Sequence, residues 1–491
     1  MTRSPDDVLA ELARRRATDA PTHGGRVLSY VYDSGLAEID DLAARAAALV
    51  QPVNGLDPTV FGSVAAMERD LITFSRNAFH GPDAVGTVTS GGTESCILAV
   101  KSARDRAGVA PGTGSIAMPS TAHAAFDKAA RLLGLRAVRV PVDPVTTRVS
   151  VSAMAEAIDD DAVLLIASAP NYPTGALDPI PELGALAVER GLPLHVDACL
   201  GGFALAWWPE TLPDWDFRIP GVSSISADLH KYGYAPKGAS VLLHADRDRH
   251  RAGFFATTDW PGYPVVNPTL LGSRSAAGLA AAWAITEHLG TEGFAGLVTK
   301  IADSTARLRA AVDGIDGLRV AGEPEGPVFA VVADEASSSP VDPHRWAAAV
   351  ADRGFVLQPQ PRYTQSDGTV LPSSTHLTVT PVTSTVLSEL ITAMHDGADA
   401  ARGLASAAAP ESLAALAEAF ADGSISVDDV LALPSEAVEA ALTGAGIDPH
   451  TDPSSTAGAL DMPAIIAAIE ALPRPVTARM LTEFLAAYGN P

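Results

Sequence analysis

Short apolar runs that alternate with helical patterns between residues 86 and 197 constrain the fold of this chain most strongly. The apolar runs are residues 87–89, 115–118, 137–140, 162–167 and 194–197, and the helical patterns between them include residues 96–106, 124–133 and 180–190. Runs of buried apolar residues separated by helices predict a mostly parallel sheet that is covered on both faces. In such sheets a ligand binds beyond the carboxyl ends of the strands.

The length of 491 residues predicts more than one domain, because a single hydrophobic core rarely grows so large. We expect a helical and loop segment over residues 1–55 and a large α/β domain over residues 56–290. A smaller α/β domain is expected over residues 291–402. Alanine-rich segments over residues 403–491 predict a helical C-terminal extension that packs against the core or a partner subunit.

Four further elements are expected after the large sheet. Helical periodicity predicts two helices, Ala276–Leu289 and Val298–Val312, and apolar runs predict strands at Val328–Ala333 and His376–Val379. The two strands indicate a smaller α/β unit that follows these helices.

The composition excludes several classes of protein. A net charge of -24 disfavours nucleic acid and anionic membranes as partners, since both attract basic surfaces. Two cysteines, Cys96 and Cys199, are too few for a disulfide framework or a metal site and fit a reducing compartment. Residues 1–20 contain no continuous apolar run, and the most apolar runs of the chain are too short to span a bilayer. We therefore expect a soluble, cytoplasmic protein.

The segment Ser90–Ser95 (SGGTES) joins the first strand to the helix that follows it. Glycines allow close backbone approach, and the free N–H groups at a helix N-terminus attract an anion. The segment indicates a phosphate site, although a tight turn with an ordinary N-cap has the same pattern. It is neither a Walker loop nor a dinucleotide fingerprint, because the required lysine and glycine spacing are missing.

Asp197 ends an apolar strand, and Lys231 lies in the segment Ser226–Gly233 (SADLHKYG). A buried carboxylate needs a cation, and a protonated pyridine nitrogen would be such a cation. A crowded lysine has a lowered pKa, so its neutral amine can attack an aldehyde and form an imine. Each residue viewed singly is also typical of an ordinary salt bridge or an exposed loop.

His123 begins a helix after a strand, where an imidazole can stack on a flat cationic ring and transfer protons. With the Ser90–Ser95 turn, Asp197 and Lys231 it forms a set whose members all lie at strand ends of one predicted sheet. Pyridoxal 5'-phosphate requires an anion cradle, a stacking partner, an anchor for its pyridinium and an amine that captures its aldehyde. The sequence therefore predicts a site for this cofactor.

Four segments resemble the sphingosine-1-phosphate lyase family, within the fold-type I, group II decarboxylase superfamily. They are Ser90–Ser95 (SGGTES), Ala122–Lys128 (AHAAFDK), His195–Phe203 (HVDACLGGF) and Ser226–Gly238 (SADLHKYGYAPKG). The resemblance implies a fold-type I transferase architecture. In it, the large domain has a mostly parallel seven-stranded sheet that binds pyridoxal phosphate, a smaller C-terminal α/β domain follows, and the helical tail is an addition.

The resemblance also implies how the cofactor is held. Lys231 forms the imine, His123 stacks on the ring and Asp197 pairs with the pyridine nitrogen. Ser273 reaches the site from the partner subunit, which implies an obligate homodimer with active sites at the interface. The residues that bind the cofactor's phosphate or lie near its hydroxyl group are Gly92, Thr93, His230 and Asn171.

Other residues are implied in catalysis and substrate binding. Lys237 matches a second lysine of the family, and Tyr32 matches an aromatic residue on its N-terminal loop. Tyr172 lies on a loop that approaches the substrate. Asn54 and Asp57 lie in a segment that the family uses for the substrate phosphate.

Two segments depart from the family pattern. Residues 54–57 read Asn-Gly-Leu-Asp where the family has Asn-Pro-Leu-His, and the Asp57 carboxylate would repel a phosphate monoester. Residues 272–276 read Gly-Ser-Arg-Ser-Ala where the family has Gly-Ser-Arg-Pro-Gly, and the membrane anchor of its eukaryotic members is not found. The departures favour a small polar or carboxylate substrate over a long-chain sphingoid phosphate.

The leading hypothesis is a pyridoxal-phosphate-dependent carbon–carbon lyase that acts on a small-molecule amine. The substrate amine displaces Lys231, and retro-aldol cleavage releases an aldehyde while Lys237 or a tyrosine helps to remove the hydroxyl proton. Loss of carboxylate instead would make the enzyme an amino-acid decarboxylase, and Asp57 keeps this alternative open. A non-catalytic protein of this fold that binds a partner is a remote third alternative, which the complete set of Lys231, Asp197 and His123 disfavours.

Overall fold

A seven-stranded sheet forms the centre of the computed structural model, which describes residues 3–57, 59–110, 112–450 and 461–488. The strands follow the order β1-β7-β6-β5-β4-β2-β3, and β7 runs antiparallel to both of its neighbours while the other pairings are parallel. The predicted mostly parallel sheet is thus confirmed. The strands are β1 (Val85–Thr89), β2 (Ser115–Pro119), β3 (Arg136–Val140), β4 (Ala162–Ser168), β5 (Leu194–Asp197), β6 (Val222–Ala227) and β7 (Ser240–His244).

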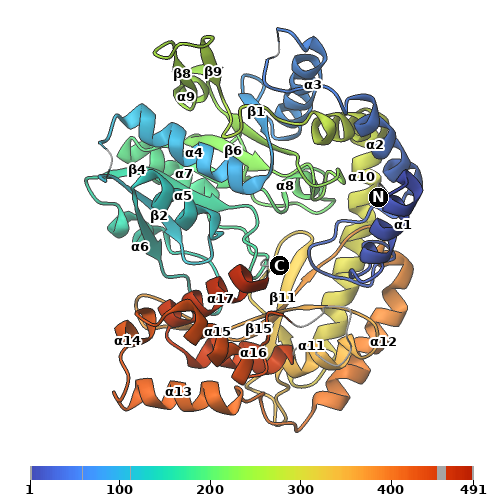
Figure 1. Cartoon of the computed structure of the whole chain (residues 1–491), viewed down its shortest axis with the longest axis vertical. Helices are drawn as coiled ribbons and strands as arrows, with labels where there is room; N and C mark the ends of the chain where they lie inside the picture. The colour runs from blue at the N-terminus through green and yellow to red at the C-terminus, as the bar shows by residue number, and fades with distance from the viewer. Residues whose placement is uncertain (1–2, 58, 111, 451–460, 489–491) are drawn as a thin grey trace.

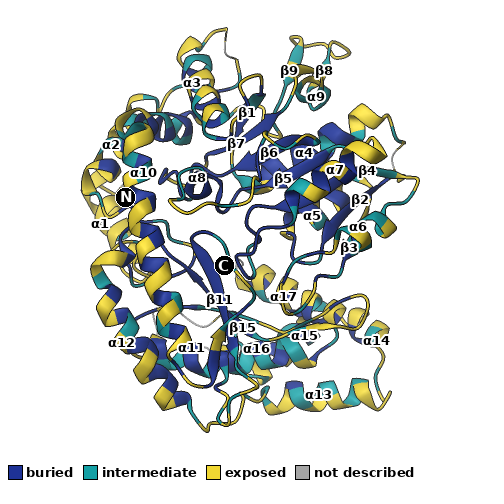
Figure 2. Ribbon diagram, turned by 180° about the vertical axis from the view of Figure 1, so that it is seen from behind, coloured by how far each residue is buried: buried dark blue, intermediate teal, exposed yellow. Residues whose placement is uncertain are grey.

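Helices cover both faces of this sheet, as β4 shows. Leu164 and Ile166 pack into one hydrophobic cluster with α4 and α5, whereas Leu165 and Ala167 pack into another with α7. Successive side chains of a strand point to opposite faces, so an uninterrupted apolar run needs a core on each side. Figure 1 shows the helices around the sheet, and Figure 2 shows its strands as buried. The helices that connect the strands are α4 (Gly92–Ala107), α5 (Ala125–Leu133), α6 (Val151–Ala157), α7 (Ile180–Arg190), α8 (Gly202–Leu205) and α9 (Arg247–Ala252).

A second, four-stranded antiparallel sheet follows, in the order β10-β11-β15-β12. It packs against α11 (Pro343–Ala351), and α11 packs against α12 (Thr383–Ala401). The two strands predicted in this region correspond to β11 and β15. The strands are β10 (Leu318–Val320), β11 (Val328–Ala333), β12 (Gln358–Gln360) and β15 (Ser374–Thr378).

One long helix, α10 (Ala277–Asp313), connects the two sheets and bends at Gly290, which has φ 52° and ψ -173°. The prediction of two helices was right about the break but wrong about residues 291–297, which are helical. Phe294 and Leu297 are buried at 0% and 4% exposure against other aromatic side chains, and this packing holds the turn in spite of its two glycines.

The remaining elements lie at the periphery. The N-terminal helices are α1 (Pro5–Arg16), α2 (Ala37–Leu49), which packs against α10, and α3 (Gly62–Ala78). Two small antiparallel pairs are β8 (Phe255–Thr257) with β9 (Val265–Asn267), and β13 (Tyr363–Thr364) with β14 (Val370–Leu371). Over the described ranges, no helix is long and apolar enough to cross a membrane.

Over its described residues, the C-terminal extension has five helices, which share a small hydrophobic cluster of their own. Figure 1 shows them in orange and red beside α11 and the four-stranded sheet. The extension contacts the rest of the chain through α16, which packs against α11 and β12, and through Arg474, which contacts Tyr363. The helices are α13 (Glu411–Ala421), α14 (Val427–Leu431), α15 (Ser435–Gly444), α16 (Met462–Ala471) and α17 (Arg474–Tyr488). The domain boundaries inferred from the sequence stay predictions.

Candidate active site

A cavity of about 960 Å³ lies at the carboxyl ends of the parallel strands. Its walls include the loops that follow β1, β2, β4, β5 and β6, where the parallel topology is expected to place a ligand. Most residues proposed for the site line this cavity. They are Tyr32, Gly92, Thr93, His123, Tyr172, Asp197, His230, Lys231 and Lys237.

Four proposed residues do not line the cavity: Asn54, Asp57, Asn171 and Ser273. Asn171 is buried in the turn after β4, where its side-chain oxygen accepts hydrogen bonds from Thr174. Asn54 donates to the Ser273 hydroxyl at 3.2 Å, so these two side chains hold their loops together. The exposed Asp57 accepts two hydrogen bonds within its own loop.

Lys231 lies in the turn after β6, and its Nζ atom is 3.0 Å from Oδ2 of Asp228. Burial alone lowers the pKa of Lys231, but the neighbouring carboxylate outweighs burial and raises this pKa well above its usual range. The expected lowering of the pKa was therefore wrong, because the sequence reasoning left out Asp228. That residue is 2% exposed and lies three residues before Lys231. A carboxylate directly after a buried strand was the signal that could have identified it.

His230 also faces Asp228, with its Nε2 atom 3.4 Å from Oδ2. On the other side of the ring, the backbone N–H groups of Gly238 and Ala239 point to Nδ1 at 3.4 and 3.3 Å. Both ring nitrogens thus have partners within the protein. The direct contact of His230 with a phosphate stays a prediction.

Asp197 ends β5 and is 7% exposed. Its Oδ1 atom accepts hydrogen bonds from the backbone N–H of Cys199 at 3.0 Å and from the Ser226 hydroxyl at 3.5 Å. Within the part of the chain that the structure describes, no group donates to Oδ2. Oδ1 is therefore held by the protein, whereas Oδ2 can accept a hydrogen bond from a ligand in the cavity.

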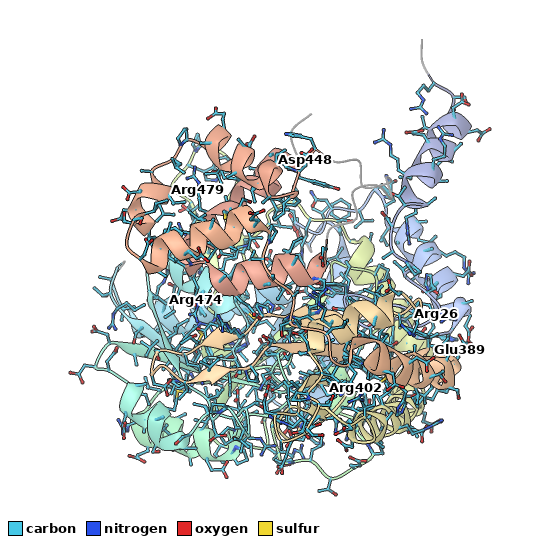
Figure 3. The ribbon with its side chains drawn as sticks, turned by 90° about the horizontal axis from the view of Figure 1, so that it is seen from below. Arg26, Glu389, Arg402, Asp448, Arg474 and Arg479 are labelled. Carbon is cyan, nitrogen blue, oxygen red and sulfur yellow. The ribbon has the colours of Figure 1, made fainter. Side chains whose placement is uncertain are left out.

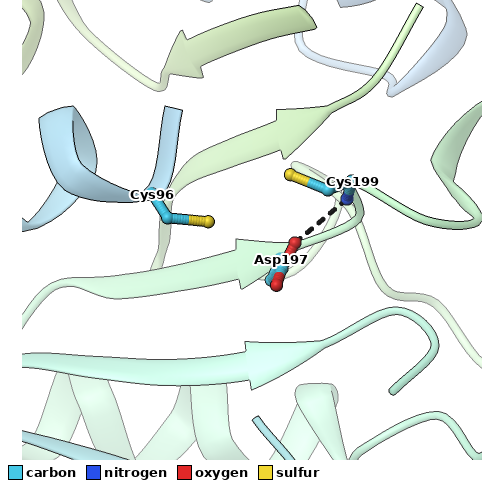
Figure 4. A group of neighbouring side chains, drawn as sticks. All are labelled: Cys96, Asp197 and Cys199. Atoms are coloured by element: carbon cyan, nitrogen blue, oxygen red, sulfur yellow. Dashed lines mark hydrogen bonds between the residues drawn. The ribbon is translucent and has the colours of Figure 1, made fainter. Parts of the chain in front are cut away.

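Two cysteines lie beside Asp197, as Figure 4 shows. The sulfur atoms of Cys96 and Cys199 and a carboxylate oxygen of Asp197 lie within 4.8 Å of one another. The exclusion of a metal site on cysteine count alone was therefore incomplete, because the fold adds a third ligand atom. The hydrogen bond from Cys199 lowers the pKa of Cys96, but burial and the charges of Asp197 and Asp228 together outweigh it and raise this pKa; burial also raises the pKa of Cys199. Neutral thiols are poor metal ligands, so the geometry favours Asp197 as an anchor for a cationic ring.

The first turn of α4 forms a cradle for an anion. A Cβ atom on Gly92 would lie 2.8 Å from Oδ2 of Asp228 and 2.9 Å from Sγ of Cys199, so the site accepts only glycine without movement. The first N–H groups of a helix have no acceptor within the helix. Those of Gly92 and Thr93 belong to residues that line the cavity, and they supply the donors that a phosphate group needs.

His123 lies just before α5, and its side chain is exposed to the cavity. Its Nδ1 atom accepts a hydrogen bond from the backbone N–H of Ala125 at 3.1 Å. This bond fixes the ring by one edge and leaves its face available for a flat ligand. The arrangement fits the predicted stacking role.

Lys237 and Tyr32 meet on another side of the cavity. Nζ of Lys237 lies 4.6 Å from the centre of the Tyr32 ring and donates to the backbone oxygen of His230 at 3.0 Å. Burial, followed by the positive charge of Lys231, lowers the pKa of Lys237 to about 8. Burial raises the pKa of Tyr32 and of Tyr172. Lys237 is therefore a better proton acceptor near neutral pH than either tyrosine.

Comparison with known proteins gives a consistent result. The family model of the pyridoxal-dependent decarboxylase conserved domain matches residues 63–315. Sphingosine-1-phosphate lyase of Oryza sativa subsp. japonica is 32% identical over 80% of this chain and 72% of the relative. A solved sphingosine-1-phosphate lyase of Burkholderia pseudomallei is 32% identical, with a TM-score of 0.76 over 88% of this chain and 96% of that structure.

The chain belongs to the pyridoxal-dependent decarboxylase family, in its sphingosine-1-phosphate lyase branch. The predicted fold-type I architecture is confirmed. Glutamate decarboxylase of Lactobacillus brevis shares this fold at only 18% identity, with a TM-score of 0.71. Sphingosine-1-phosphate lyase 1 of Rattus norvegicus is 37% identical over 72% of this chain. The match covers 62% of the rat relative, so this member of the family spans less than two thirds of its length.

The residues of the cavity fit the family's cofactor, pyridoxal phosphate. The α4 N-terminus, closed to any residue larger than glycine at position 92, suits the phosphate group. The free oxygen of Asp197 suits the pyridine nitrogen, and His123 presents its ring to a stacked ligand. Lys231 lines the same cavity, and its amine is the group that would bind the aldehyde of the cofactor.

Proposed function

We propose that this chain is a pyridoxal-phosphate-dependent carbon–carbon lyase that cleaves a phosphorylated amino alcohol by a retro-aldol reaction. The observation that carries the proposal is a second lysine in the cavity: Lys237, with a pKa of about 8, next to Lys231. A retro-aldol cleavage requires a base for the substrate hydroxyl group, whereas loss of carboxylate requires none. Lys237 satisfies this requirement.

The roles of the chain's own residues follow from their positions. Bound pyridoxal phosphate supplies an electron sink for the bond that breaks at the amine-bearing carbon. Asp197 would hold a positive charge at the pyridine nitrogen, and Lys231 would hold the aldehyde carbon of the cofactor until the substrate amine replaces it. Neutral Lys237 would remove the hydroxyl proton as the carbon–carbon bond breaks and the aldehyde leaves, and the proton held by Lys237 could then return to the amine-bearing carbon.

The cavity wall supports a substrate with an apolar chain. Ala321, Val332 and Leu371 line the cavity together with Pro359, Pro361 and Pro372. Hydrocarbon binds such a wall favourably, at roughly 25 cal/mol per Å² buried. Asp57, which the sequence analysis set against a phosphorylated substrate, does not line the cavity of its own chain. The structure thus favours a larger substrate than the small carboxylate suggested by the Asp57 substitution.

The proposal also includes the oligomeric state and the cellular compartment. We infer that the protein is a homodimer. The exposed hydrogen bond between Asn54 and Ser273 supports this, because it lies on the surface where the Ser273 loop could contact a partner subunit. Buried, unpaired Cys96 and Cys199 support a reducing compartment such as the cytoplasm.

Product analysis tests the reaction. Purified protein loaded with pyridoxal phosphate should show a visible imine band that borohydride removes, and it should release aldehyde from phosphorylated amino alcohols. Lys231→Ala should lack both the band and the activity, while Lys101→Ala, which lies on α4 outside the cavity lining, should retain them. Carbon dioxide from a panel of amino acids, without aldehyde from the amino alcohols, would establish the decarboxylase instead. Absence of the imine band and of both activities would leave only a binding protein.

A further inference from the structure

A hairpin of the small domain forms part of the cavity wall. It comprises residues 361–373, contains the pair β13–β14, and contributes Pro361, Tyr363, Leu371 and Pro372 to the lining. The Gln365 side chain, 4% exposed, attaches it to the large sheet: it exchanges hydrogen bonds with the backbone of Val142 and accepts one from Ser120. The hairpin therefore bridges the two sheets across the cavity.

The C-terminal extension holds the base of this hairpin through one side chain. Oε1 of Glu470, on α16, accepts a hydrogen bond from the backbone N–H of Arg362 at 2.8 Å and another from the Ser373 hydroxyl at 2.6 Å. Arg362 lies at the N-terminal end of the hairpin and Ser373 at its C-terminal end. A single oxygen atom thus joins the two ends of the hairpin.

A second contact reaches a residue of the cavity wall itself. The guanidinium group of Arg474, at the start of α17, lies 4.0 Å from the centre of the Tyr363 ring and donates to the backbone oxygen of Thr364. Figure 3 labels Arg474 among the C-terminal helices. A stacked guanidinium limits the positions that an aromatic ring can adopt. Tyr363 is therefore held from outside the cavity.

We propose that the C-terminal helices determine which substrate chains the cavity accepts, with Glu470 and Arg474 as positioning residues for the hairpin. The proposal rests on the proposed lyase function, because it concerns the substrate's apolar chain. Across the described residues, no hydrogen bond connects α13–α17 with Lys231, Asp197 or His123. The helices should thus affect the binding of the chain and leave the binding of the cofactor unchanged.

A matched set of variants separates this role from general packing. Glu470→Ala removes both hydrogen bonds of Oε1, whereas Glu470→Gln keeps an oxygen atom in the same place that can accept both. Glu436→Ala, at an exposed position of α15, controls for loss of a glutamate from the extension. Each variant is examined as the full chain loaded with pyridoxal phosphate.

Two measurements decide the proposal. Loss of two hydrogen bonds should raise amide hydrogen exchange in residues 361–373 about 10-fold in Glu470→Ala, and Glu470→Gln should restore it. The KM for phosphorylated amino alcohols with long alkyl chains should rise about 5-fold or more in Glu470→Ala, while kcat, the imine band and the KM for short-chain analogues stay unchanged.

Several outcomes would overturn the proposal. These are unchanged exchange in Glu470→Ala, an equal effect in Glu436→Ala, no recovery in Glu470→Gln, or an equal rise in KM for short and long chains. If the wild-type protein cleaves no phosphorylated amino alcohol, the lyase proposal fails by itself. Binding of long-chain and short-chain analogues, measured by calorimetry, then replaces KM, so the two failures stay distinguishable.

Discussion

At the scale of single residues, the charge around Lys231 determines the chemistry of the site. Asp228, 3.0 Å away, raises the pKa of Lys231, and Lys231 in turn lowers the pKa of the buried Asp228 well below its usual range despite desolvation. A buried lysine alone would lose its charge, but a paired one keeps it. Burial and the charge of Lys231 lower the pKa of Lys237 to about 8, so Lys237 loses its proton at a lower pH than Lys231 does.

We expect the pH dependence of the reaction rate to follow the deprotonation of Lys237. Its pKa of about 8 means that the neutral amine becomes more abundant as the pH rises through 8, and activity should rise with it. Lys237→Met should lose this rise and reduce kcat about 100-fold at pH 8, as expected for removal of a general base. The measurement is kcat/KM against pH for both proteins. Lys237→Arg keeps the charge but not the base, so recovery of activity in that variant would assign Lys237 to binding alone.

At the scale of elements, the β1–α4 junction shows why a helix N-terminus becomes a binding site. The strand β1 ends with Thr89 at the carboxyl edge of the sheet, and α4 starts three residues later with Gly92. The turn packs so closely on Asp228 and Cys199 that a side chain cannot fit. The backbone N–H groups, and no side chain, therefore face the ligand at this point.

Gly92→Ala should weaken the binding of pyridoxal phosphate. The added Cβ lies 2.8 Å from Oδ2 of Asp228, and overpacking of this kind costs about 1–3 kcal/mol, or roughly 5- to 150-fold in affinity if the turn moves to relieve it. Gly62→Ala is the matched control: Gly62 is also the first residue of a helix, and a Cβ there meets nothing within 4 Å. Titration of the imine band gives the affinity of each variant. Equal affinities would show that the turn accepts a methyl group without moving.

At the scale of the whole molecule, the cavity lies between the two sheets, and the C-terminal helical cluster packs outside its wall. The seven-stranded sheet supplies the cofactor residues, and the four-stranded sheet with its hairpin supplies the apolar wall. The loop that carries Ser273 does not contribute to this cavity. This placement is expected if the loop completes the cavity of a second subunit.

A mixing experiment tests the proposed shared site. Lys231→Ala and Ser273→Asp homodimers should each be inactive, the first without the imine and the second with a negative charge near the phosphate. After exchange of subunits, heterodimers with one intact site should regain up to about a quarter of the wild-type activity, since half the dimers are mixed and each has one site. No recovery, with dimers confirmed by light scattering, would place Ser273 outside the partner's site.

Much of the large sheet could be predicted from local patterns, and the rest could not. The strand β4 is apolar from Ala162 to Ala167, because a strand covered on both faces has no polar side. By contrast, β6 (VSSISA) escaped prediction since its serines resemble a loop. In the structure these serines are buried and bonded: Ser223 donates to the backbone of Leu194, and Ser224 pairs with the His195 ring.

The sequence by itself indicated most of the residues that line the cavity, because they lie in short motifs at strand ends and the parallel topology brings strand ends together. The tertiary structure alone decided how these residues are charged and what encloses them. The pKa of Lys231 depends on a contact with Asp228 that only the folded turn creates. Likewise, Glu470 meets Arg362 across 108 residues of sequence, and no local pattern encodes such a contact. Local motifs specify chemistry, whereas protonation and the cavity wall arise from packing between distant segments.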